Sequence, residues 1–143
     1  MGKWTEEELN TIFDGTSGRC HLCHTRLAWK NYGVVGTRGA WHVDHSRARA
    51  RGGSDYLRNL KPACISCNCS KGDGSNQSIR ARYGKTRAPL SRESRRRARL
   101  GNTVGFGGLG WLIGRAFLGP GPAILGAIIG ATIGNHSDPD KIR

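Results

Sequence analysis

The sequence predicts a small α+β domain, a basic linker and a glycine-rich helical hairpin, over residues 1–78, 79–100 and 101–143. Three observations lead to this division. Two cysteine pairs with C-x-x-C spacing lie in the first segment, nine Lys or Arg and a single acidic residue lie in the second, and the third holds half of the chain's 22 glycines. A chain of 143 residues supports one small core with appendages rather than several large domains.

The first predicted element is a helix that begins after Thr5 and ends near Asp14-Gly15. The Thr5 hydroxyl can accept a hydrogen bond from an unpaired backbone N–H, so it is a suitable N-cap. Three glutamates then occupy the first turn, where the helix dipole favours negative charge. The apolar stripe that would face a core consists of Leu9, Ile12 and Phe13.

The rest of the first segment predicts little regular structure. Residues 20–29 indicate a tight turn leading into a strand, residues 33–45 a second strand or hairpin arm, and residues 63–71 a turn that opens a short helix. From Ser78 to Leu100 the chain is basic and contains Gly84 and Pro89, which favours a linker with a helix from Ser91 to Leu100. A solvated tail is the alternative interpretation of this segment.

The two cysteine pairs supply four thiolates, the usual ligand set of a structural zinc site: Cys20, Cys23, Cys64 and Cys67. The start of the chain does not resemble a secretory signal, so we expect reduced thiols and a cytoplasmic location, at the inner face of a membrane if the tail binds one. Disulfides are the alternative. His21 and His24 could replace a thiolate, and Cys69 is interpreted as a spare thiol. Zinc binding would add folding free energy to a domain with few large apolar residues.

The forty residues between the two pairs contain a recognisable constellation. They include Asp44-His45, Gly52-Gly53 and Asn59-Leu60, and the second pair continues as Cys67-Asn68-x-x-Lys71. Together these residues resemble the HNH endonuclease family in its four-cysteine form, over roughly residues 8–90. The resemblance implies a ββα-metal fold, in which two antiparallel strands and a helix hold one divalent ion.

The same resemblance implies roles for individual residues. His45 matches the general base that activates water, and Asn59 matches the residue whose carboxamide orients that base. Asp44 matches a metal ligand. Asn68 stands where the motif's last histidine usually lies, which makes this an HNN version with Asn68 as the second metal ligand.

This chemistry is also reasonable from the residue types. Phosphodiester cleavage needs an activated water and stabilisation of negative charge, which a neutral imidazole and a divalent cation supply. Hard oxygen ligands such as those of Asp44 and Asn68 suit Mg²⁺ or Mn²⁺. Adjacent strand residues point to opposite faces, so the strand is expected to end or bulge at His45. His42 shares the Asp44 face and is a candidate extra ligand.

The charge distribution predicts a polyanionic partner. The net charge is +13 and the sequence pI is about 10.5. Arg47, Arg49 and Arg51 alternate along a segment that we expect to be extended, and with Lys71 they are predicted to bind DNA phosphates. A solvated run of charges is the alternative. Gly52 and Gly53 indicate a turn with positive φ angles.

The apolar stretches of the tail, residues 104–119 and 123–134, are each shorter than the roughly twenty residues of a membrane-spanning helix. Glycines recur at every fourth position, as in Gly126, Gly130 and Gly134, which allows close helix contact. We therefore predict a glycine-zipper-like helical hairpin that self-associates and binds an anionic membrane.

The sequence as a whole favours a metal-dependent DNA endonuclease with weak sequence preference, since no separate recognition domain is recognisable. Two other functions stay open: a zinc-stapled nucleic-acid-binding module without catalysis, and a membrane-active toxin that works through the tail.

Overall fold

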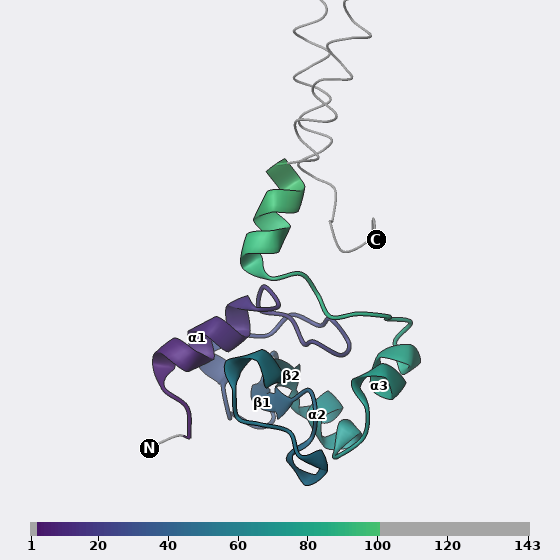
Figure 1. Ribbon diagram of the computed structural model, residues 1–143. Coiled ribbons are helices and arrows are strands. Elements are labelled where there is room, and N and C mark those ends of the chain that lie inside the picture. Colours follow the sequence, from purple (N-terminus) through teal and green to yellow (C-terminus); the bar gives the residue numbers. More distant parts are fainter. Residues whose placement is uncertain (1–2, 101–143) are drawn as a thin grey trace, which may run out of the picture. The chain divides into compact units, whose positions relative to one another are not determined.

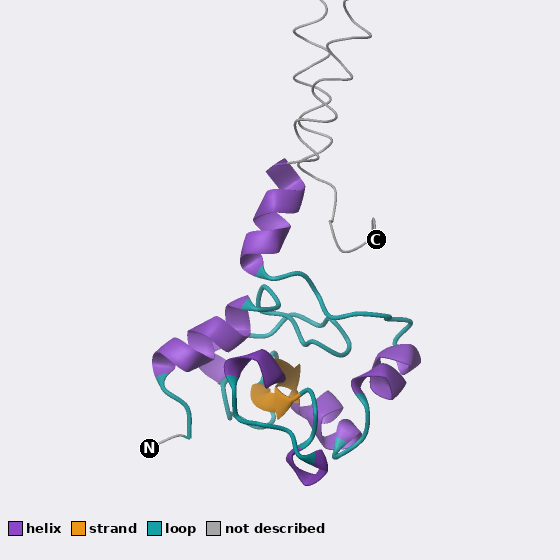
Figure 2. Ribbon diagram, viewed as in Figure 1, coloured by secondary structure: helices purple, strands orange, loops and turns teal. Residues whose placement is uncertain are grey.

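The computed structural model of the protein describes residues 3–100. Residues 3–92 lie in one compact unit and residues 93–100 in a second. In chain order the first unit contains α1 (Glu6–Asp14), β1 (Trp41–His45), β2 (Leu60–Cys64), α2 (Ile65–Lys71) and α3 (Asn76–Arg82) (Figures 1 and 2). Short 3₁₀ turns occupy Trp29–Asn31, Arg49–Arg51 and Leu57–Asn59. The predicted glycine-rich hairpin lies outside the described residues.

The order β1, β2, α2 is the ββα arrangement that the sequence predicts. The strands pair antiparallel, from Trp41 opposite Cys64 to His45 opposite Leu60. The positions of the strands differ in part from the prediction. Residues 20–40 form turns and isolated bridges, so the strand expected to follow the first cysteine pair does not form. The partner of β1 is instead β2, in a segment for which no strand was expected. Pro62 fits in β2 because each strand of a two-stranded sheet has one unpaired edge.

Helix α1 forms as predicted. The Thr5 hydroxyl accepts from the Glu8 backbone N–H, and the Glu8 carboxylate accepts from the Thr5 backbone N–H, which is a complete capping box. Gly15 is the C-cap. Ile12 is buried in the core, and α1 packs against β2.

The core is built around Trp41, the first residue of β1, whose side chain is fully buried. The Phe13, Tyr32 and Trp29 rings lie with their centroids 5.1, 4.8 and 6.0 Å from that of Trp41. The Trp41 indole N–H donates to the Ala28 carbonyl, so its polar atom is satisfied. The few apolar side chains of the domain thus fix the start of β1, whose other end carries the candidate site.

Helix α3 crosses the boundary that the sequence placed at residue 78. Ser75 caps α3, and Ile79 is buried in the core, so the compact unit continues into the segment interpreted as a linker. Residues 92–100 are helical, close to the helix predicted from Ser91 to Leu100. Within residues 3–100, no helix combines the length and the apolar character needed to cross a membrane. The three-part division itself stays a prediction.

Candidate metal centre and active site

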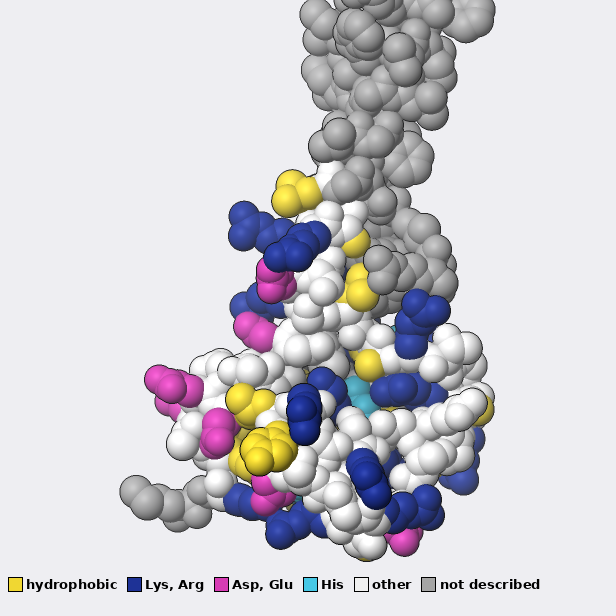
Figure 3. Space-filling view, viewed as in Figure 1, with side chains coloured by type: hydrophobic (Ala, Val, Ile, Leu, Met, Phe, Trp, Pro, Cys, Tyr) yellow, Lys and Arg dark blue, Asp and Glu magenta, His cyan; other side chains and the backbone are white. Residues whose placement is uncertain are grey.

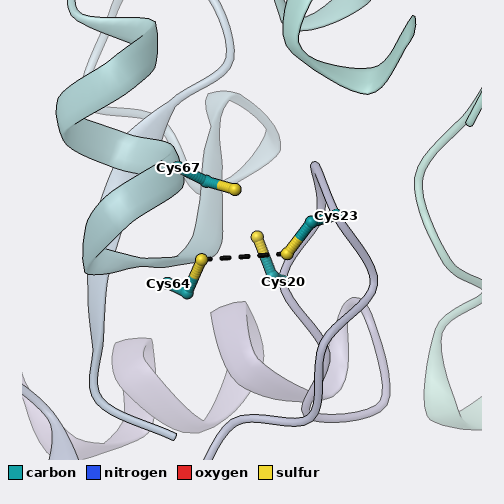
Figure 4. Close-up of side chains that lie close together, drawn as sticks. All are labelled: Cys20, Cys23, Cys64 and Cys67. Atoms are coloured by element: carbon teal, nitrogen blue, oxygen red, sulfur yellow. Dashed lines mark hydrogen bonds between the residues drawn. The ribbon is translucent and has the colours of Figure 1, made fainter. Parts of the chain in front are cut away.

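The four predicted cysteine ligands form one cluster. The sulfur atoms of Cys20, Cys23, Cys64 and Cys67 all lie within 4.8 Å of one another and turn toward a common point (Figure 4). The Sγ atoms of Cys23 and Cys64 are 3.8 Å apart, and all four cysteines are free thiols, so they do not form disulfides. A tetrahedron with zinc–sulfur distances of about 2.3 Å has edges of about 3.8 Å. The cluster can therefore hold a structural metal such as zinc.

The local backbone explains how the cluster forms. Residues 20–24 make a tight turn in which the His24 N–H donates to the Cys20 carbonyl and the Leu22 N–H donates to Cys20 Sγ. His24 closes the turn with a φ of 67°. The other pair spans the junction of β2 and α2, where Cys64 is the N-cap and Cys67 lies in the first turn of the helix. A metal there would clamp the turn to the β2–α2 junction.

The four thiols lie so close together that they shift one another's pKa values, and hydrogen bonding to Cys20 and Cys64 lowers the pKa of Cys23. Hydrogen bonding to Cys23 and Cys64, together with burial, raises the pKa of the Cys20 thiol. Burial and the neighbouring thiols raise the pKa of Cys67 to about 12. If all four cysteines bound a metal as thiolates, the charge of a divalent ion would offset their mutual repulsion. Neither His21 nor His24 belongs to this cluster within the described residues.

Asp44, the predicted ligand of the second metal, is held at both carboxylate oxygens. His21 Nε2 lies 2.7 Å from Oδ2, and Lys71 Nζ lies 2.8 Å from Oδ1. Asp44 is only 4 % exposed. Burial lowers the pKa of His21, although the hydrogen bond to Asp44 acts in the opposite direction. Two fixed donors therefore hold the rotamer of this carboxylate.

His45, the predicted general base, is the last residue of β1, so the strand ends at the residue where it was expected to end or bulge. Its Nε2 lies 2.6 Å from Asp55 Oδ1. The hydrogen bonds from His45 and Lys3 lower the pKa of Asp55, so this carboxylate is ionised and can only accept. The proton of a neutral His45 ring is therefore on Nε2, and Nδ1 is left as an acceptor with no hydrogen-bond partner among residues 3–100.

Asn59, whose carboxamide was predicted to orient the base, bonds to the backbone of the loop that follows His45. Its Oδ1 accepts from the Arg47 N–H, and its Nδ2 donates to the carbonyls of Arg47 and Ser54. The side chain thus closes the loop between β1 and β2, which begins after His45 and carries Asp55. Asn59 fixes the backbone on both sides of the His45–Asp55 pair rather than touching the ring.

The glycine pair lets the same loop fold tightly. Gly52 has a φ of 75°, as predicted. Gly53 does not have a positive φ, but a Cβ there would lie 1.8 Å from the Arg47 carbonyl oxygen. Gly52 therefore provides the turn, and Gly53 allows the close approach of two backbone segments.

Asn68 lies on α2, three residues before Lys71, so the two side chains share a helix face. Because Lys71 bonds to Asp44 and to the His45 carbonyl, that face of α2 is turned toward the end of β1. No hydrogen bond of the Asn68 carboxamide occurs among residues 3–100. Each Asp44 oxygen keeps a second lone pair. Asp44 and Asn68 both offer oxygen atoms, the ligand type that hard divalent cations prefer, although both Asp44 oxygens already accept hydrogen bonds from His21 and Lys71.

Lys71 and the arginines occupy different environments. Lys71 is 4 % exposed and bonded internally, so it does not lie on the surface that would meet a phosphate. Arg47, Arg49 and Arg51 are exposed, but Arg49–Arg51 is a 3₁₀ turn rather than the extended segment that was expected. Figure 3 shows Lys and Arg side chains along the lower and right sides of this view and others in its centre, while several acidic side chains lie over α1.

Two residues of the site, Asp55 and Arg80, were not predicted from the sequence, and His21 was considered only as a replacement for a thiolate. Asp55 had a usable signal, since it is the carboxylate in the loop between the predicted base and Asn59. His21 and Arg80 had none, because their contacts join segments that are far apart in the sequence: His21 Nε2 to Asp44, and Arg80 Nε to the His21 carbonyl.

Comparison with known proteins agrees with this geometry. The family model of the HNH endonucleases matches residues 20–74, which is less than half of the chain. No curated protein and no solved structure matches the chain. The matched residues include both cysteine pairs, the two strands and α2. Residues 20–74 of this chain therefore form a domain of the HNH endonuclease family, with its four cysteines clustered as in the metal-stapled form.

Proposed function

We propose that this protein is a metal-dependent DNA endonuclease with weak sequence preference, in which His45 is the general base. The observation that carries the proposal is the state of the His45 ring within an HNH domain: Nε2 is bonded to Asp55, and Nδ1 has no partner among the described residues. An imidazole fixed in this tautomer can take a proton from water at Nδ1.

The neighbouring side chains support this chemistry. Asp55 would stabilise the imidazolium that forms when Nδ1 takes a proton, as a carboxylate does for a catalytic histidine in other hydrolases. Asp44 and Asn68 would hold Mg²⁺ or Mn²⁺, which would supply stabilisation of negative charge on the phosphate and on the leaving oxygen. The exposed Arg47, Arg49 and Arg51 would bind neighbouring phosphates. Zinc at the four cysteines would be structural.

The test is cleavage of supercoiled plasmid by the full chain with Mg²⁺, with Mn²⁺ or with EDTA. We expect cleavage that EDTA abolishes, and a loss of about 10²- to 10⁴-fold in the His45→Ala variant, the usual contribution of a general base. The zinc content of the variant should equal that of the wild type, and its cooperative unfolding should be retained with a slightly lower midpoint, because the contact with Asp55 is lost. As a control, Asp73→Asn, which removes an exposed carboxylate in the turn before α3, should retain full activity.

Two results would contradict the proposal. Cleavage that His45→Ala leaves unchanged would exclude this residue as the base. Salt-sensitive DNA binding by a folded, zinc-loaded wild type that does not cut DNA under any of these conditions would instead support the nucleic-acid-binding module without catalysis.

A further inference from the structure

A line of four side chains runs from Arg80 through His21 and the predicted ligand Asp44 to Lys71. Arg80 Nη2 lies 3.3 Å from His21 Nδ1, His21 Nε2 lies 2.7 Å from Asp44 Oδ2, and Lys71 Nζ lies 2.8 Å from Asp44 Oδ1. The His21 side chain is fully buried and Asp44 is 4 % exposed. Because these contacts are shielded from water, they constrain Asp44 more strongly than surface contacts would.

The partners of His21 determine which of its nitrogens carries the proton. A guanidinium can only donate, so Nδ1 must accept from Arg80. Nε2 must then carry the proton and donate it to Asp44. The backbone of His21 is fixed as well, since its N–H donates to the Pro62 carbonyl and its carbonyl accepts from Arg80 Nε. Every polar atom of this histidine therefore has a partner that holds it in place.

The position of His21 makes this arrangement more than a packing feature. His21 directly follows Cys20 in the metal knuckle, so a metal on the four cysteines would hold its backbone rigidly. Its ring reaches β1, where it fixes one oxygen of Asp44 while Lys71 from α2 fixes the other. With both oxygens held, the orientation of the remaining lone pairs is fixed.

We propose that His21 is a positioning residue, which orients Asp44 toward the divalent cation of the active site and is itself held in the required tautomer by Arg80. The proposal rests on the proposed function, in that it assumes a second divalent ion at Asp44. Hydrogen-bond partners of metal ligands typically contribute about 10- to 100-fold to metal affinity. His21 acts through Asp44 and does not touch the cation.

The experiment measures Mn²⁺ affinity of the full, zinc-loaded chain by the loss of the free Mn²⁺ electron paramagnetic resonance signal. We expect His21→Ala to bind Mn²⁺ about 10- to 100-fold more weakly than the wild type. His21→Gln should recover most of this loss, because its amide N–H can still donate to Asp44. His24→Asn is the matched control in the same knuckle: the ring of His24 bonds to the Arg87 carbonyl, and asparagine tolerates its positive φ.

Further variants test the route of the effect. In an Asp44→Asn background, changing His21 should no longer alter the residual Mn²⁺ affinity. If His21→Ala does not fold, Arg80→Met keeps the test open, since it leaves no cavity beside Asp44 yet removes the donor that fixes the tautomer. Arg80→Met should weaken Mn²⁺ binding, but by less than the roughly 10- to 100-fold expected when a hydrogen-bond partner of a metal ligand is removed.

Several outcomes would overturn the proposal. One is an unchanged Mn²⁺ affinity in folded His21→Ala or Arg80→Met. Another is an equal loss of Mn²⁺ affinity in His21→Ala and His21→Gln. A third is loss of zinc from both His21 variants, which would mean that His21 acts on the cysteine cluster. These outcomes do not depend on cleavage. Normal Mn²⁺ binding with no cleavage would contradict the proposed function and leave this inference standing.

Discussion

The buried ion pair between Lys71 and Asp44 gives the sharpest prediction for stability. The two side chains are 0 % and 5 % exposed, and the Lys71 ammonium also donates to the His45 carbonyl at 2.7 Å. Lys71→Met keeps most of the side-chain volume but leaves Asp44 with His21 as its remaining partner. Removing one member of a buried ion pair costs about 3–5 kcal/mol, because the other charge stays buried and uncompensated.

This loss is a large share of the about 5–15 kcal/mol by which domains are stable. In a domain of this size it corresponds to a fall in the unfolding midpoint of roughly 10–40 °C. The assay is guanidinium unfolding of zinc-loaded protein, followed by tryptophan fluorescence, since Trp41 is fully buried when the protein is folded. The double variant with Asp44→Asn should lose less than the sum of the two single losses.

Lys61→Met is the matched control. Lys61 lies opposite Asp44 in the sheet but makes no ion pair within the described residues, so its replacement should change the free energy of unfolding by less than about 0.5 kcal/mol. A loss below about 1 kcal/mol for Lys71→Met, the value of an exposed pair, would refute the reasoning that burial makes this contact strong.

Three further predictions concern the loop and the metal. The ¹³C resonance of the Asp55 carboxyl should titrate with a pKa below the ordinary value of 3.8. The contribution of Asp55 to stability is then present above pH 3.8 and is lost as the pH falls through the lower pKa of the folded state. In His45→Ala the pKa of Asp55 should rise again, and a wild-type pKa at or above 3.8 would exclude the contact. Gly53→Ala should displace the loop and reduce cleavage, since its Cβ would lie 1.8 Å from the Arg47 carbonyl oxygen, and a crystal structure with an unmoved loop would be the contrary result. Purified protein should contain one zinc per chain by elemental analysis, and Cys64→Ser should lower both zinc content and the unfolding midpoint; a zinc-free protein of unchanged stability would show that the cluster is not a staple.

The sequence by itself determined the parts of this protein that depend on local chemistry. The capped α1 follows from Thr5 and its glutamates, and the metal cluster follows from the C-x-x-C spacing, because each pair is close along the chain and four thiolates suit one kind of ion. The HNH motif was recognisable for the same reason: its residue types and spacings can be read along the chain.

Only the tertiary structure decided which side chains meet across the fold. The pairing of β1 with β2, the burial of Ile79 in α3 and the internal position of Lys71 all depend on contacts between distant segments. The hydrogen bond between His21 and Asp44 is of the same kind. A histidine and a lysine look like surface residues in a sequence, because spacing along the chain does not reveal which buried carboxylate each will contact.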